Sequence, residues 1–149
     1  RKKLIAEMVG LLGGRAAEEL VFDDITSGAS NDIERVTQLA RNMVTRLGMS
    51  AELGPMVYGQ NEELIFLGRE ISEQRDYSES VAEKIDKEVR SLVNNAYSQA
   101  KSILTTYRKE LDDIANRLLE VETLSREEFE KIFPPPVPHH SGTPEITLN

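Results

Sequence analysis

The sequence contains no cysteine and no tryptophan, and it has only two histidines among its 149 residues. Without cysteine, the chain cannot form a disulfide, a thiolate zinc site or a cysteine nucleophile. The two histidines, His139 and His140, are adjacent and close to the C-terminal end. They are candidate metal ligands, but two neighbouring imidazoles in a proline-rich segment rarely form a site. No histidine therefore lies in the part of the chain that we expect to fold, where it could serve as the base of a serine hydrolase.

Cationic side chains are outnumbered by anionic ones, 18 to 26, which gives a formal net charge of −8. A nucleic-acid-binding protein needs cationic groups that displace counterions from phosphates, so this balance argues against a nucleic-acid partner. Long apolar runs are also missing: the longest extend over a handful of residues, whereas a membrane-spanning helix needs about 20. We therefore expect the chain by itself to be soluble.

Several recognisable sequence signals are absent as well. The basic residues 1–3 precede only a short apolar stretch that Glu7 interrupts, which is not the pattern of a signal peptide. There is no glycine-rich loop ending in Gly-Lys-Ser or Gly-Lys-Thr and no Gly-x-Ser-x-Gly motif, so neither a nucleotide site nor a nucleophile elbow is visible. The first residue is not methionine, and we expect the chain to be a piece of a longer protein.

What the sequence does have is apolar residues at three- and four-residue spacing, which indicates helices. The first predicted helix covers residues 2–20 and contains the pair Gly13-Gly14, either a weak point or a notch where a neighbour packs closely. After a loop, a second helix is predicted to start at Asn31, because Asn31 and Glu34 have the spacing of a capping box. Gly48 is predicted to end this helix.

The strongest periodicity lies further along the chain and predicts one amphipathic helix of roughly thirty residues. Its apolar positions are Val81, Ile85, Val89, Leu92, Val93, Ala96, Ala100, Ile103, Leu104 and Tyr107. Another helix over residues 111–119 either continues it or turns back on it. Ser125 and Glu128 then form a capping-box pattern that predicts a short final helix.

Two regions do not follow a helical pattern. Residues 49–76 are irregular, and we expect a small hairpin or a pair of loops there. Residues 134–149 are rich in proline and are expected to form a disordered tail. The predicted fold is therefore mainly α: a helical bundle with one long amphipathic helix and a small irregular or short-strand segment, formed by residues 1–133.

The stretch Thr26–Glu34 is the most unusual part of the sequence. Small residues lead into a helix whose first turn carries Asp32. One interpretation is that this carboxylate complements the helix dipole. The other is that the small residues let another element approach closely and that Asp32 binds a cation. The spacing alone leaves both interpretations open.

Two other features also allow more than one interpretation. One interpretation of Leu11–Leu20 is an ordinary helix, with its glycines at a packing contact and with Glu18 and Glu19 solvated. Tyr58 and Phe66 can form an edge that binds an extended peptide, or they can be ordinary core aromatics.

Taken together, several motifs in a fixed order resemble the FtsH family of membrane-anchored, ATP-dependent zinc metalloproteases of bacteria, mitochondria and chloroplasts. These motifs are Leu11-Leu-Gly-Gly-Arg-Ala-Ala-Glu-Glu19, Thr26-Ser-Gly-Ala-Ser-Asn-Asp-Ile-Glu34, Ala40-Arg-Asn-Met-Val44, Gly48-Met-Ser50, Leu53-Gly-Pro55 and Phe66-Leu-Gly-Arg69. The resemblance covers about residues 4–133.

The resemblance implies a mainly helical peptidase domain that binds zinc. In the family, two histidines of an His-Glu-x-x-His helix and a distant aspartate hold the metal, and the glutamate of that motif is the general base. The aspartate of the family's Asn-Asp-Ile motif corresponds here to Asp32, which is therefore expected to be the third zinc ligand. Glu18 falls in the family's Ala-Glu-Glu element and is expected to support the site without binding the metal.

This chain also departs from the family's pattern, because it contains no His-Glu-x-x-His, no nucleotide loop and no transmembrane helix. We interpret it as the C-terminal part of the peptidase domain, with no complete catalytic set, inactive alone and unable to hold zinc tightly. The resemblance implies a parent that degrades membrane and soluble proteins as a hexamer, with ATP and magnesium at an ATPase module. That parent would lie at the cytoplasmic face of the bacterial inner membrane or at an organellar membrane, anchored by a segment absent here. The alternative is a non-catalytic helical module for assembly or scaffolding.

Overall fold

A computed structural model describes residues 1–59 and 77–133 of the chain. Within these ranges it contains five helices and no strand, so the prediction of a mainly α fold is confirmed. The helices are α1 (Lys2–Phe22), α2 (Ser30–Thr45), α3 (Glu79–Thr106), α4 (Arg108–Val121) and α5 (Arg126–Ile132). Residues 49–59 form turns rather than a strand, and the remainder of the expected hairpin lies outside the described residues. The expected tail over residues 134–149 also lies outside them.

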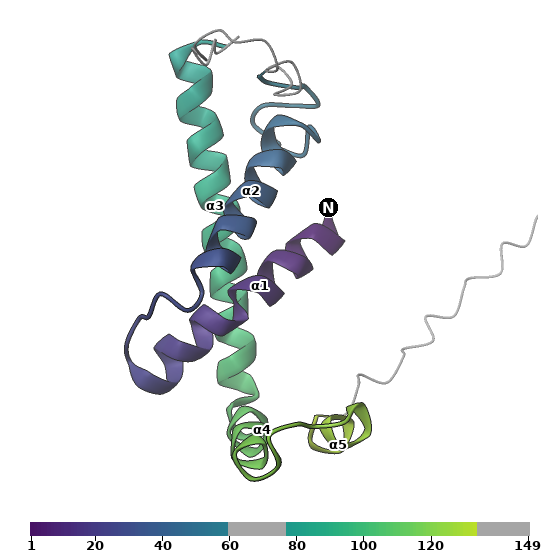
Figure 1. Ribbon diagram of the computed structural model, residues 1–149. Helices are drawn as coiled ribbons and strands as arrows, with labels where there is room; N and C mark the ends of the chain where they lie inside the picture. Colours follow the sequence, from purple (N-terminus) through teal and green to yellow (C-terminus); the bar gives the residue numbers. More distant parts are fainter. Residues whose placement is uncertain (60–76, 134–149) are drawn as a thin grey trace, which may run out of the picture. The chain divides into compact units, whose positions relative to one another are not determined.

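The chain divides into two compact units, residues 1–106 and residues 107–149. The first unit contains α1, α2 and α3, and each of these helices packs against the other two (Figure 1). The second contains α4 and α5. The assignment of residues 1–133 to one domain stays a prediction.

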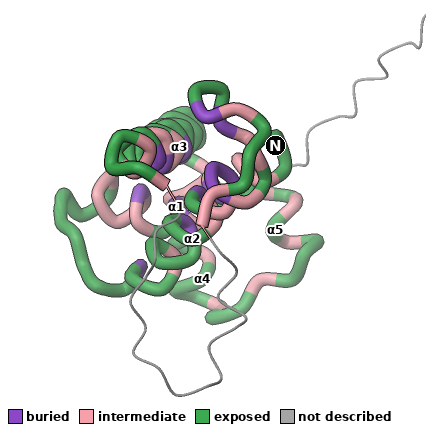
Figure 2. The backbone as a smooth tube through the Cα atoms, turned by 90° about the horizontal axis from the view of Figure 1, so that it is seen from above, coloured by how far each residue is buried: buried purple, intermediate pink, exposed green. Residues whose placement is uncertain are grey.

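The core of the first unit lies where its three helices meet (Figure 2). Burying a large apolar side chain such as Met, Ile or Val stabilises the folded state by about 1.5–3 kcal/mol, so the few largest buried side chains contribute much of the stability of this core. The largest fully buried side chains are Met8, Met43, Ile85, Val36 and Val44. The long amphipathic helix supplies its predicted apolar face to this core, with Ile85, Val89, Ala96 and Ala100 buried.

Helix α1 runs without interruption through Gly13 and Gly14. A Cβ atom added at either glycine would meet nothing within 4 Å, so the packing notch, one of the two interpretations of this pair, is not formed by the described residues. The side of α1 that carries Gly13 instead borders a hollow of about 440 Å³ between α1 and α3. The residues lining this hollow are Ala6, Val9, Gly10, Gly13, Gln99, Ala100, Ile103 and Leu104.

The start of α2 differs from the predicted one by one residue. The helix begins at Ser30, with Ala29 as its N-cap and no side-chain hydrogen bond to the cap. Asn31 is already inside the first turn, so the predicted capping box with Glu34 is not formed. Ala29 is buried, only 6% exposed, and its burial accounts for a cap position without a polar side chain.

Gly48 follows α2 at the position where the chain reverses. Its φ of +57° is in the left-handed region, and an added Cβ would lie 2.9 Å from the Cα of Pro55. Both facts require glycine at this position. Helix α2 ends at Thr45 with Arg46 as its C-cap, so Gly48 lies two residues beyond the cap and marks the reversal of the chain rather than the predicted end of the helix.

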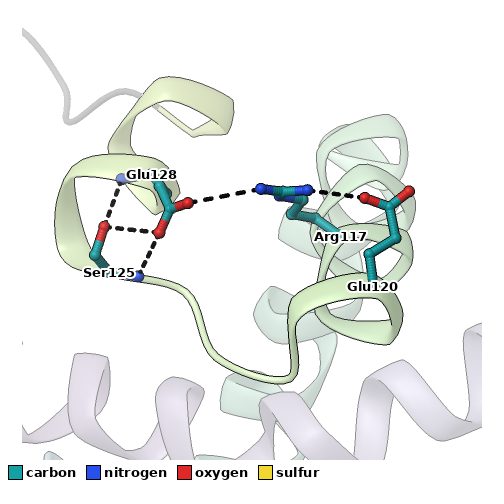
Figure 3. A network of polar contacts seen from close by, with 4 residues as sticks. All are labelled: Arg117, Glu120, Ser125 and Glu128. Atoms are coloured by element: carbon teal, nitrogen blue, oxygen red, sulfur yellow. Dashed lines mark hydrogen bonds and ion pairs between the residues drawn. The ribbon is translucent and has the colours of Figure 1, made fainter.

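In the second unit, α4 and α5 are joined by polar and aromatic contacts. The predicted capping box is confirmed: the backbone N–H of Glu128 donates to Ser125 Oγ at 3.2 Å, and the N–H of Ser125 donates to Glu128 Oε2 at 3.0 Å (Figure 3). These bonds from Ser125 lower the pKa of Glu128. Arg117 lies between Glu128 and Glu120, with ion-pair distances of 3.7 and 2.8 Å (Figure 3).

Candidate metal ligand and the loop that carries it

Asp32 is the third residue of α2, so its carboxylate lies at the positive end of the helix dipole. The side chain is 43% exposed, and its Oδ1 lies 3.8 Å from Nη1 of Arg35 in an ion pair that is itself solvent-exposed. Exposed pairs at this separation contribute little to stability. The carboxylate is therefore accessible, and its contact with Arg35 is weak enough for a stronger partner to replace it.

The loop before α2 is held to α1 by Glu18. Its Oε1 accepts a hydrogen bond of 2.9 Å from Oγ1 of Thr26, and its Oε2 accepts one of 3.4 Å from the Thr26 backbone N–H. Thr26 Oγ1 in turn accepts from the backbone N–H of Gly28 at 3.1 Å. Glu18 thus contacts the loop that leads to Asp32, whereas its expected support of a metal site stays a prediction.

Glu19, the next residue, is one-third exposed, but it is paired with another helix rather than only solvated, as one interpretation of the sequence had it. Its carboxylate accepts hydrogen bonds from the Tyr97 hydroxyl and, at 2.8 Å, from Lys101 Nζ, both on α3. The bond from Lys101 is the largest of the effects that lower the pKa of Glu19. Burial and the neighbouring Glu19 raise the pKa of Tyr97. The sequence contains no signal for this contact beyond the i,i+4 spacing of Tyr97 and Lys101 on one helix.

Over residues 1–132 the sequence matches the family described as Peptidase family M41. This chain belongs to peptidase family M41. It is 56% identical to the ATP-dependent zinc metalloprotease FtsH of Thermotoga maritima, over 133 residues that make up 89% of this chain and 22% of that protein. It is 51% identical to FtsH 1 of Thermomicrobium roseum over 146 residues, 97% of this chain and 22% of that protein.

A third relative, the ATP-dependent zinc metalloprotease FtsH of Mycobacterium bovis, is 53% identical over 133 residues. The resemblance inferred from the motifs is thus confirmed. The chain spans about a fifth of the length of the curated relatives it matches.

The donor atoms of the described residues fit one position of a zinc site, not a whole site. A catalytic zinc ion usually takes three protein ligands, and carboxylate oxygens are among the accepted donors. Asp32 offers such an oxygen in an exposed position. Across residues 1–59 and 77–133, however, no three His, Cys, Asp or Glu side chains are grouped so that they could hold a metal ion.

Tyr58, the other candidate within the described residues, is part of the packed interior. Tyr58 donates to the Leu53 carbonyl at 2.9 Å and packs edge-on against Tyr77, with ring centroids 6.2 Å apart. It also lies against the hydrophobic core, which agrees with the interpretation as a core aromatic. Phe66, His139 and His140 lie outside the described residues. None of the described helices is long and apolar enough to cross a membrane.

Proposed function

We propose that this chain supplies one metal ligand, Asp32, to the peptidase centre of an ATP-dependent zinc metalloprotease. Membership of peptidase family M41 over residues 1–132 is the observation that carries the proposal. The relatives' names, ATP-dependent zinc metalloprotease, agree with it. The exposed carboxylate in the first turn of α2 adds a donor that suits zinc.

In this proposal the other metal ligands, two histidines, and the general-base glutamate come from an His-Glu-x-x-His helix outside the printed sequence. Zinc, when bound, supplies a Lewis acid and an activated water for peptide hydrolysis. Asp32 holds one side of the coordination shell, and Glu18 supports the loop before it. This chain alone would then neither cut peptides nor hold zinc tightly, because a single carboxylate is one ligand of the three that are needed.

The proposal extends to the whole protein. Its substrates are proteins, both membrane-bound and soluble, and it works as a homo-oligomer, which we propose to be a hexamer. ATP and magnesium bind at a separate ATPase module, and a further segment anchors the protein to a membrane. The helices over residues 78–133 provide packing and subunit contacts in that assembly.

The test compares zinc content and casein degradation for the 149-residue chain and for the full-length protein that contains it. The full-length protein is expected to hold about one zinc per chain and to degrade casein, whereas the 149-residue chain does neither. Asp32→Asn in the full-length protein should abolish proteolysis and zinc retention while leaving ATP hydrolysis intact. Glu34→Gln is the matched control, because Glu34 is another exposed acid of the same helix and is not proposed as a ligand.

Wild-type zinc content and casein degradation in Asp32→Asn would refute the ligand assignment. If the wild-type full-length protein holds no zinc and cuts nothing, the peptidase proposal fails as a whole. The role of a helical assembly module would then be favoured.

A further inference from the structure

The C-terminal turns of α1 carry two adjacent carboxylates that form contacts with different elements. Glu19 binds Tyr97 and Lys101 and so joins α1 to α3. Glu18 binds the hydroxyl and the backbone N–H of Thr26 and so joins α1 to the loop before α2. At this end of α1, Glu19 therefore fixes the helix to α3, and Glu18 fixes the loop before α2 to the helix.

The loop contacts continue from Thr26 to the start of α2. Thr26 Oγ1 donates to Glu18 and accepts from the Gly28 N–H at 3.1 Å, so this single hydroxyl connects α1 to Gly28. Gly28 is followed by the buried N-cap Ala29. The carbonyl of Ala29 accepts the N–H of Ile33 at 3.0 Å, which closes the helical turn that contains Asp32.

Gly28 shows how closely these groups are packed. A Cβ atom added there would lie 3.2 Å from Oε1 of Glu18 and 3.3 Å from Oγ1 of Thr26. A side chain at this position would press on both partners of the 2.9 Å hydrogen bond. The absence of a side chain at Gly28 is thus part of the arrangement.

We propose that Glu18, Thr26 and Gly28 form a positioning latch that holds the first turn of α2, and with it the Asp32 carboxylate, in the place where it meets the metal. The inference rests on the proposed function, because it assigns the latch a purpose only if Asp32 is a ligand. It adds Thr26 and Gly28 to the residues that act on the site. Groups that orient a metal ligand without touching the metal typically change metal affinity by about 10- to 100-fold when removed.

The experiment measures zinc affinity of the full-length protein by competition with a chelator of known affinity. Thr26→Val removes the bridging hydroxyl at nearly constant volume, and we expect the zinc dissociation constant to rise about 10-fold. Thr26→Ser retains the hydroxyl and should restore wild-type affinity. Thr37→Val is the matched control, because the Thr37 hydroxyl donates to the Ile33 carbonyl at 2.8 Å within α2 and does not contact the latch.

A second readout does not involve zinc or activity. Hydrogen–deuterium exchange of the metal-free protein, followed by mass spectrometry, should become faster over residues 24–33 in Thr26→Val and remain unchanged there in Thr26→Ser. If Thr26→Val fails to fold, Glu18→Ala replaces it, because that change removes both acceptor oxygens of the latch.

The outcomes separate the latch from the proposed function. If Asp32→Asn loses zinc while Thr26→Val binds zinc like wild type, the latch is refuted and the ligand assignment stands. If Asp32→Asn binds zinc like wild type, the proposed function fails and the positioning role of the latch fails with it. Equal losses in Thr26→Val and Thr37→Val would also overturn the latch, because they would reflect general weakening of the helix.

Discussion

Replacing Gly14 with alanine should stabilise the chain, although a Gly-Gly pair inside a helix suggests a structural need for glycine. Gly14 lies inside α1, is exposed, and has nothing within 4 Å of an added Cβ. Alanine costs less conformational entropy than glycine on entering a helix, by about 0.5–1 kcal/mol. Because no neighbour must move, we expect the full gain, and a similar gain for Gly13→Ala.

The measurement is thermal unfolding of the 149-residue chain, followed by circular dichroism at a helical wavelength. For a protein of about 150 residues, 1 kcal/mol corresponds to a shift of about 2–4 °C in the melting temperature. Gly48→Ala is the control of opposite sign. Gly48 has a φ of +57°, and its added Cβ would lie 2.9 Å from the Pro55 Cα, so that variant should lose stability.

A loss of stability in Gly14→Ala would refute this reasoning, because it would show that another group occupies the space beside Gly14. The same variant in the full-length protein gives a second comparison. Stabilisation in the chain combined with destabilisation in the full-length protein would show that a segment outside the printed sequence packs against this side of α1.

Two further results are expected. Ionised Glu19 should stabilise the first unit above about pH 4.5, because hydrogen bonds from Lys101 and Tyr97 lower its pKa from 4.5. This stabilisation is lost as the pH falls through the lowered pKa. Unfolding titrations from pH 7 to 3 should therefore show a smaller decline for Glu19→Gln than for wild type, and an identical decline would contradict the paired arrangement. Ile85→Ala should cost about 2–5 kcal/mol in urea unfolding, because Ile85 is only 1% exposed; a cost below 1 kcal/mol would show that the core is not packed around it.

The helices themselves could be predicted from the sequence, because each depends on periodicity within a short segment. The apolar spacing from Val81 onward gave the long helix and the face that it buries. Ser125 and Glu128 gave the start of α5, since both partners of a capping box lie within four residues of each other.

The start of α2 and the environment of Glu19 could not be predicted in the same way. Ala29 takes the N-cap position because it is buried by the surrounding structure, and the capping pattern at Asn31 contains no information on that burial. Glu19 and Lys101 are 82 positions apart. Periodicity gives the faces of each helix, but it does not give which residue of another helix lies opposite.

The two interpretations of Asp32, helix capping and metal binding, are compatible in energy. A carboxylate in the first helical turn gains only about 0.3–1 kcal/mol from the dipole, and it can keep this gain while one of its oxygens binds a metal. The dipole is therefore too weak to hold Asp32 away from a metal. Asp32→Asn should accordingly cost the metal-free chain no more than about 1 kcal/mol of stability. A larger loss there would mean that Asp32 stabilises the fold in a way that the weak pair with Arg35 does not explain.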